Sequence, residues 1–187
     1  MNLYIDPTGK INIQESNASN VIVALKVTEG TGQPIYTVDN QGEIVLNVTG
    51  SASSDQLNLF GFQKIGTTYG KTINSGTMNI TSSLTTPVST LNTIGIYDDI
   101  VTYYTNTEEA EIINSGTLNV SSDMKLDISA NKSDIVARVS SEGIQVRRIT
   151  SNIISGPIIY SLLKNSGTID VKSKLEFAWT SLRRGIR

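Results

Sequence analysis

Ile113-Asn114-Ser115-Gly116-Thr117 is the stretch of sequence that decides the fold, because nearly the same five residues return at 73–77 and at 164–168. In each copy a polar dipeptide and a glycine separate two arms in which apolar and polar residues alternate. This pattern is typical of a β-hairpin whose glycine takes the left-handed conformation that residues with a Cβ disfavour. The motif therefore predicts a protein built from tight turns and amphipathic strands.

Similar turns recur along the chain. The first follows Leu3-Tyr4-Ile5, where Pro7 fixes one turn position and a glycine ends the turn. The intervals between the turns drift, which is weak evidence for a regular repeat. We predict positive φ and a hairpin turn at six glycines, namely Gly9, Gly42, Gly76, Gly116, Gly143 and Gly167.

The composition favours strands over helices. Val, Ile, Thr and Tyr dominate the ordered-looking runs, and no stretch shows a sustained helical period. The nearly continuous apolar run 21–27 predicts a central strand buried on both faces. We therefore predict an all-β fold, an antiparallel sandwich or meander of hairpins in a single domain over residues 1–187. The Ser- and Thr-rich segment 82–93 is a candidate sub-boundary.

The repeated Asn-Ser-Gly-Thr copies are followed by Leu-Asn-Val at 118–120 and by Ile-Asp-Val at 169–171. These units resemble repeats in the β-solenoid passenger regions of bacterial autotransporter adhesins, and they are also similar to hairpin repeats of β-rich bacteriophage structural proteins. The first resemblance implies a β-solenoid with irregular repeats, which is the alternative to the hairpin sandwich. It covers about ten residues in each copy.

The chain contains no Cys and no His. Their absence removes disulfides, thiolate chemistry, the commonest general base and the commonest zinc ligand. No stretch approaches the roughly 20 apolar residues of a membrane-spanning helix, and the N-terminus lacks a basic segment followed by an apolar run. We therefore expect no enzymatic activity, no cofactor, no metal and no membrane partner.

Two acidic clusters are the candidates for chemistry, Asp98-Asp99 and the group Glu108, Glu109 and Glu111. A carboxylate pair held roughly 5–10 Å apart can cleave a glycosidic bond, and the same oxygens can bind Ca²⁺. Neither spacing is visible in the sequence, so we expect a solvated acidic face. Five Asn-x-Ser/Thr acceptors are explained by the abundance of these residues, at Asn17, Asn47, Asn79, Asn119 and Asn131.

The net charge of −2 hides a division along the chain. Residues 1–136 hold six Lys and fourteen acidic residues and sum to −8, whereas residues 137–187 hold nine basic and three acidic residues and sum to +6. The basic part lacks the dense stripe with stacking aromatics that nucleic-acid binding favours. An acidic protein surface is therefore the better partner for it.

The last segment, 174–187, combines large apolar side chains with arginines, the residue types of interface hot spots. Its apolar spacing fits either a strand or one helical face. We predict a docking tail that binds the acidic body of another copy, with the candidate interface residues Phe177, Trp179, Arg183, Arg184 and Arg187.

These observations favour a non-enzymatic structural subunit of a larger assembly. The leading interpretation is a bacteriophage virion component, such as a capsid-decoration or tail protein, whose partners are other copies and other structural proteins. The alternative is a secreted or cell-surface adhesin or carbohydrate-binding module. In that case a glycan would contact the tyrosines that the sequence suggests are exposed, Tyr97, Tyr103 and Tyr104.

Overall fold

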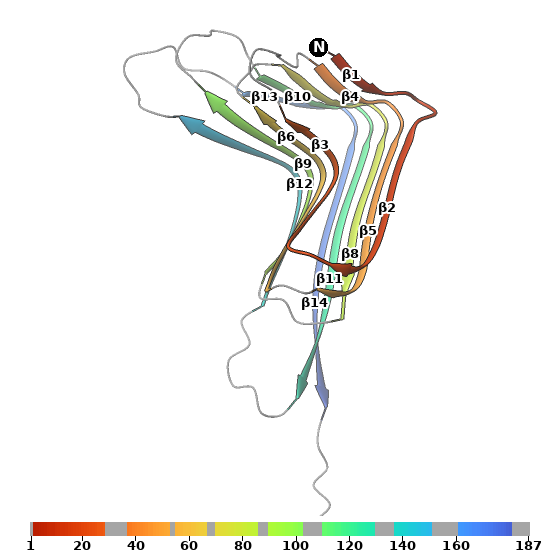
Figure 1. Cartoon of the computed structure of the whole chain (residues 1–187), viewed down its shortest axis with the longest axis vertical. Coiled ribbons are helices and arrows are strands. Elements are labelled where there is room, and N and C mark those ends of the chain that lie inside the picture. Colours follow the sequence, from red (N-terminus) through yellow and green to blue (C-terminus); the bar gives the residue numbers. More distant parts are fainter. Residues whose placement is uncertain are drawn as a thin grey trace, which may run out of the picture.

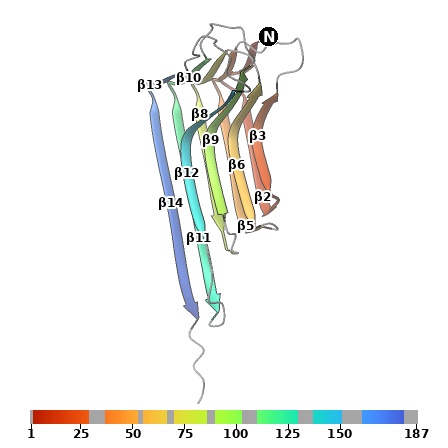
Figure 2. The same ribbon diagram turned by 90° about the vertical axis from the view of Figure 1, so that its left-hand side faces the viewer.

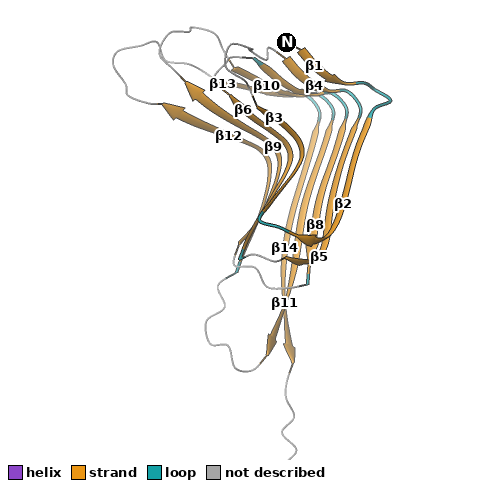
Figure 3. Cartoon of the chain, in the orientation of Figure 1, coloured by secondary structure: helices purple, strands orange, loops and turns teal. Residues whose placement is uncertain are grey.

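All regular structure in the described part of the chain is β-strand (Figure 3). The computed structural model describes residues 2–28, 37–52, 55–66, 70–85, 90–102, 110–129, 137–150 and 161–180. The strands are β1 (Asn2–Ile5), β2 (Lys10–Ala18), β3 (Val21–Thr28), β4 (Thr37–Asn40), β5 (Glu43–Ala52), β6 (Gln56–Gly66), β7 (Lys71–Asn74), β8 (Thr77–Leu84), β9 (Thr90–Thr102), β10 (Ala110–Asn114), β11 (Thr117–Ser129), β12 (Arg138–Thr150), β13 (Ser161–Asn165) and β14 (Thr168–Thr180).

The strands form three parallel sheets, each of which takes every third strand of the chain. Sheet A has the order β1-β4-β7-β10-β13, sheet B the order β2-β5-β8-β11-β14, and sheet C the order β3-β6-β9-β12. Successive triplets therefore stack as rungs, with strands of the same sheet nested in Figure 1 and side by side in Figure 2. The protein is a parallel β-solenoid, in which each rung pairs only with its neighbours.

This architecture corrects the predicted antiparallel sandwich of hairpins. The two arms of each Asn-Ser-Gly-Thr copy belong to different sheets: β10 pairs with β7 and β13 in sheet A, while β11 pairs with β8 and β14 in sheet B. The Ser-Gly dipeptide is thus the corner between sheets A and B. Alternating arms on either side of a short link fit a hairpin and a solenoid corner equally well, which is why the local pattern misled.

The corner backbone bonds to the preceding rung. Ser115 N and Gly116 N both donate to the carbonyl oxygen of Asn74, each at 2.9 Å, and Thr117 N donates to the oxygen of Gly76 at 2.9 Å. The corners at Gly76 and Gly167 repeat this arrangement on the rung before them. The corners therefore form a stack in which each one is held by its neighbour, visible as the teal segments between sheets A and B in Figure 3.

The prediction of positive φ at the turn glycines is wrong. Among the described glycines only Gly50 has positive φ, at 90°. Glycine is required at the corners because the rungs approach closely: a Cβ on Gly116 would collide with the carbonyl oxygen of Gly76. The same collision would occur between Gly42 and Gly9, between Gly76 and Gly42, and between Gly167 and Gly116.

Gly143 is not a turn residue at all, because it lies inside β12. Together with Gly61 of β6 and Gly95 of β9 it lies between register pairs that flank it on both sides, in a sheet whose strands bend along their length (Figure 1). A Cβ on Gly95 would lie 2.6 Å from the oxygen of Gly143 and 2.5 Å from Leu118 Cδ1 of sheet B. These glycines let sheet C approach sheet B closely.

A column of asparagine amides runs through the stack beside the corners. Asn40 Nδ2 donates to Asn74 Oδ1 at 2.8 Å, Asn74 Nδ2 to Asn114 Oδ1 at 2.7 Å, and Asn114 Nδ2 to Asn165 Oδ1 at 2.8 Å. Each of the three donors also reaches a threonine carbonyl of the next rung. Asn40, Asn74 and Asn114 are buried, so this column joins four rungs by hydrogen bonds inside the protein. At its first end, Asn40 Oδ1 is buried without a hydrogen-bond partner among the described residues.

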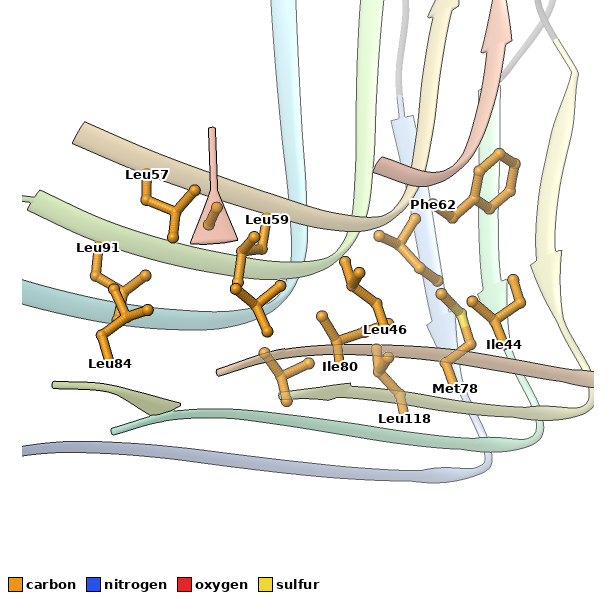
Figure 4. Packing of buried hydrophobic residues seen from close by; sticks show 14 of the residues in the cluster. Ile44, Leu46, Leu57, Leu59, Phe62, Met78, Ile80, Leu84, Leu91 and Leu118 are labelled. Atoms are coloured by element: carbon orange, nitrogen blue, oxygen red, sulfur yellow. The ribbon is translucent and has the colours of Figure 1, made fainter. Parts of the chain in front are cut away.

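The main core lies where sheets B and C face each other (Figure 4). Inward positions of neighbouring rungs carry apolar residues in register, for example Ile44, Met78 and Leu118 in sheet B. Leu57, Leu59 and Leu91 of sheet C pack against this layer. Such in-register columns are what a parallel ladder requires, because each residue lies beside its equivalent in the next rung.

The predicted central strand 21–27 is an edge strand. It forms β3, which ends sheet C at the first rung and pairs only with β6. Its apolar run reflects two packing layers, since Ile22 and Leu25 contact the main core while Val23 contacts a second cluster of Phe60, Ile94 and Tyr97.

The candidate sub-boundary 82–93 spans the end of β8 and the start of β9, and its residues 86–89 lie outside the described part. Residues 174–180 of the ambiguous C-terminal segment belong to a strand, because β14 continues to Thr180 and pairs with β11 throughout, while residues 181–187 lie outside the described part. The apolar residues of 175–179 therefore follow strand alternation and not a helical face.

Substituting the corner glycine tests the close approach. Gly116→Ala should lower the free energy of unfolding by about 3 kcal/mol, the upper range for overpacking, because the added methyl meets backbone that cannot move independently. Ser115→Ala, at the exposed neighbouring position, should change it by less than about 0.5 kcal/mol. Urea unfolding measures both, and equal midpoints would contradict the stacking role of the glycine.

Truncation of the amide column should depend on position. Asn74→Ala leaves buried partners on both sides, Asn40 Nδ2 and Asn114 Oδ1, and should cost about 3 kcal/mol of unfolding free energy. Asn165→Ala removes only the exposed end, where Asn114 still reaches Thr168, and should cost about 1 kcal/mol or less. The comparison by chemical denaturation would refute an interior role if the two losses were the same.

Candidate functional site

Sheet C holds most of the buried charged side chains among the described residues. Asp98 and Asp99 are successive residues of β9, so their side chains project to opposite faces of the sheet. Asp98 faces inward, where Thr72 Oγ1 of sheet A donates to its Oδ2 at 2.9 Å. Asp99 faces outward, where the guanidinium of Arg147 binds it. Both carboxylates are buried, so sheet C has a separate polar group on each face.

The interior group consists of Lys64, Asp98 and Thr72. Lys64 of β6 is the register neighbour of Asp98, and both are almost fully buried. Lys64 Nζ has no hydrogen-bond partner among the described residues. A buried ammonium is expensive unless an opposite charge lies nearby, and the adjacent strand places Asp98 in that position.

The outer group consists of Tyr97, Asp99 and Arg147. Arg147 Nε and Nη2 contact the two oxygens of Asp99 at 3.2 and 2.5 Å, a bidentate arrangement. This hydrogen bonding raises the pKa of Arg147. Burial raises the pKa of Tyr97, and the negative charge of Asp99 raises it further. The Tyr97 ring packs against Phe60 with 5.1 Å between centroids, so the group is a packed, charge-neutralised patch.

Asp98 and Asp99 do not form the predicted carboxylate pair. Asp98 and Asp99 lie on opposite faces of one sheet, and each has its own partner. Their burial corrects the expectation of a solvated acidic face at these two positions. Glu111 lies in sheet A between Lys71 Nζ at 3.0 Å and Lys164 Nζ at 2.9 Å. Glu108 and Glu109 lie outside the described residues.

No set of three or more acidic side chains in the described ranges is placed to hold a metal ion. Hydrogen bonds from Lys164 and then Lys71 hold the pKa of Glu111 below its ordinary value of 4.5. Glu111 therefore bridges lysines of the two adjacent rungs as a carboxylate. This bridge lies on the outer side of the solenoid, as does the Lys10–Glu43 pair at 2.8 Å.

Other residues predicted as binding groups have varied positions. Tyr97 is buried, which corrects its expected exposure, whereas Tyr103 and Tyr104 lie outside the described residues. Phe177 is 50% exposed on β14. Trp179 belongs to the same strand, where Ile128 of β11 is its register neighbour. The three predicted interface arginines, Arg183, Arg184 and Arg187, lie outside the described part.

Four Asn-x-Ser/Thr asparagines, Asn17, Asn47, Asn79 and Asn119, lie on the outer face of sheet B, where their amides are bonded between rungs. Asn119 Nδ2 donates to Asn79 Oδ1 at 2.8 Å, and Asn47 Nδ2 donates to Gln14 Oε1 at 2.8 Å. Thr81 Oγ1 donates to Asn47 at 2.8 Å. These contacts give the outer face a polar ladder of its own. The sequence analysis predicted neither this outer ladder nor the column of asparagine amides beside the corners. The signal was present, since an asparagine stands two residues before each of Gly42, Gly76, Gly116 and Gly167.

Comparison with known proteins identifies no relative. No protein-family model matches the chain, no curated protein matches it, and no solved structure matches its fold. Within the described residues there is no helix that is long and apolar enough to cross a membrane.

The Glu111 bridge predicts acid sensitivity. A carboxylate with a lowered pKa in the folded state stabilises the protein above its ordinary pKa of 4.5, and this contribution is lost as the pH falls through the lower folded value. Glu111→Gln should therefore flatten the fall in melting temperature over this acidic range. Lys164→Met, which removes the largest cause of the shift, should flatten it partly. An unchanged pH profile in both variants would contradict the bridge.

Proposed function

We propose that this chain is a non-enzymatic structural segment, a rigid β-solenoid shaft in a larger extracellular assembly of the adhesin type. The stacking of its rungs supports this role, because backbone, amide and apolar contacts all run along one direction. A protein built in this way gains stability from neighbour-to-neighbour contacts and presents extended, regular faces.

The stack of corners between sheets A and B is the observation that supports this proposal. The Asn-Ser-Gly-Thr copies that are similar to autotransporter passenger repeats are the residues that lie on one another at successive corners. Stacked corners belong to a β-solenoid, the alternative fold that this resemblance implied. The side chains most suited to binding chemistry, Asp98, Asp99 and Arg147, are instead engaged within the fold.

A virion component is the second candidate. The division of charge, with −8 over residues 1–136 and +6 over residues 137–187, favours a protein that assembles with others along an axis. The same shaft geometry serves a phage tail or decoration protein. The two candidates differ in location, either the outer surface of a cell or a purified particle.

Location separates the candidates directly. An antibody raised against the folded chain should label intact source cells, and external protease should remove that label while a cytosolic marker protein remains. Detection in purified virus particles, with no surface label on uninfected cells, would reject the adhesin proposal and favour the virion. A signal found only inside intact cells would overturn both.

The chain should show no glycoside hydrolase turnover. Incubation with a panel of surface polysaccharides should release no reducing ends above the level of Asp99→Asn, which removes one negative charge beside Arg147 and keeps the side-chain shape. Release that the wild type supports and Asp99→Asn abolishes, with both proteins folded by circular dichroism, would establish an enzyme and refute the proposal.

A further inference from the structure

In the part of the chain that the structure describes, the two ends of the solenoid are unpaired edges of the same sheets. Among the described residues, β13 and β14 end sheets A and B on one side, and β1 and β2 end them on the other. Large apolar side chains are exposed at both ends: Leu163 is 54% exposed, Val171 40% and Tyr4 53%. Open parallel edges with exposed apolar residues are templates for another strand.

The residues at the two ends continue the same columns. Val171 ends the column that begins at Ile13 and passes through Leu46, Ile80 and Val120. Ile169 ends the column that begins at Ile11, and Leu163 ends the column that begins at Leu3. A second copy placed one rung beyond β14 in the same direction therefore meets Val171 with Ile13 and Leu163 with Leu3.

The backbone at the corner is also complementary. At every described step between rungs, the residue after a corner glycine donates its N–H to the preceding glycine oxygen, as Thr168 N does to Gly116 O at 2.9 Å. Repetition of this step in the next copy would pair Lys10 N with Gly167 O. Gly167 O already accepts a long bond of 3.3 Å from Asn165 Nδ2, and a carbonyl oxygen has a second lone pair.

The net charges of the two edges favour one partner for the β13–β14 edge and one orientation of that partner. The C-terminal edge, residues 161–180, carries three basic and two acidic residues, whereas residues 2–18 at the N-terminal edge carry one basic and two acidic residues. Two-fold pairing of C-terminal ends would bring like charges together, while head-to-tail stacking brings opposite net charges together. A heterologous contact of this kind repeats without closing.

We propose that copies of this chain stack head to tail, the β13–β14 edge of one copy pairing with the β1–β2 edge of the next. The inference rests on the proposed structural function and assigns it a partner, a second copy of the same chain. Five rungs at roughly 4.8 Å would make each copy add about 24 Å to a filament. Salt weakens the contact by screening the charges.

Sedimentation of the purified chain at low and physiological salt tests the proposal. Wild-type protein should form species at multiples of 20.2 kDa that grow with concentration. Val171→Lys places a charge where Ile13 of the next copy would lie and should remain a folded monomer. Ser83→Lys adds the same charge to an exposed position of the inner strand β8 and should assemble like the wild type. A monomeric wild type, or equal assembly of both variants, would overturn the proposal.

Mixing experiments establish direction. Val171→Lys keeps an intact β1–β2 edge, so a small fraction added to wild type should cap growing ends and shorten the assemblies. Two-fold association predicts no capping, and failure to shorten them would reject the head-to-tail arrangement. A folded wild-type monomer found on the cell surface would sink this inference and leave the shaft proposal standing.

Discussion

Close approach of one rung to the next is the constraint on which the structure depends. At the corner between sheets A and B, the glycine of one rung lies directly against the carbonyl oxygen of the glycine before it, and any Cβ there would collide. The backbone donors of Ser115, Gly116 and Thr117 are satisfied by the same approach. Because the corner fixes the register, apolar residues of sheets B and C align in columns and fill the space between the sheets.

Sheet C carries the structural irregularity. Gly61, Gly95 and Gly143 let it approach sheet B closely, and strand alternation places Asp98 and Asp99 on its two faces with different partners. Burial of these groups is compatible with stability because each carboxylate has a bonded donor. The polar residues most suggestive of chemistry therefore contribute to the packing of sheet C.

Local sequence patterns predicted the strands and their alternation, but not which strands pair. A short polar link with glycine has the same appearance whether the two arms pair with each other or with other rungs, since pairing depends on contacts far apart in the sequence. The asparagines make the difference: Asn40, Asn74, Asn114 and Asn165 are separated by 34, 40 and 51 residues. Because Gly143 was predicted to be a turn, the interval of 51 residues between Asn114 and Asn165 was divided in two, and the recurrence of the asparagine was not recognised. The separation of Asp98 from Asp99 follows from strand alternation, whereas their burial required knowledge of how sheet C packs.

The amide column gives the molecule a direction. Every Nδ2 in it points towards the later rung and every Oδ1 towards the earlier one, so the side-chain dipoles lie in line and polarise one another. At one end Asn40 presents an acceptor beside Ile5, which offers no side-chain donor, and at the other end Asn165 presents donors. The solenoid therefore has a direction along its axis. A rung added in the reverse orientation would interrupt the line of side-chain dipoles.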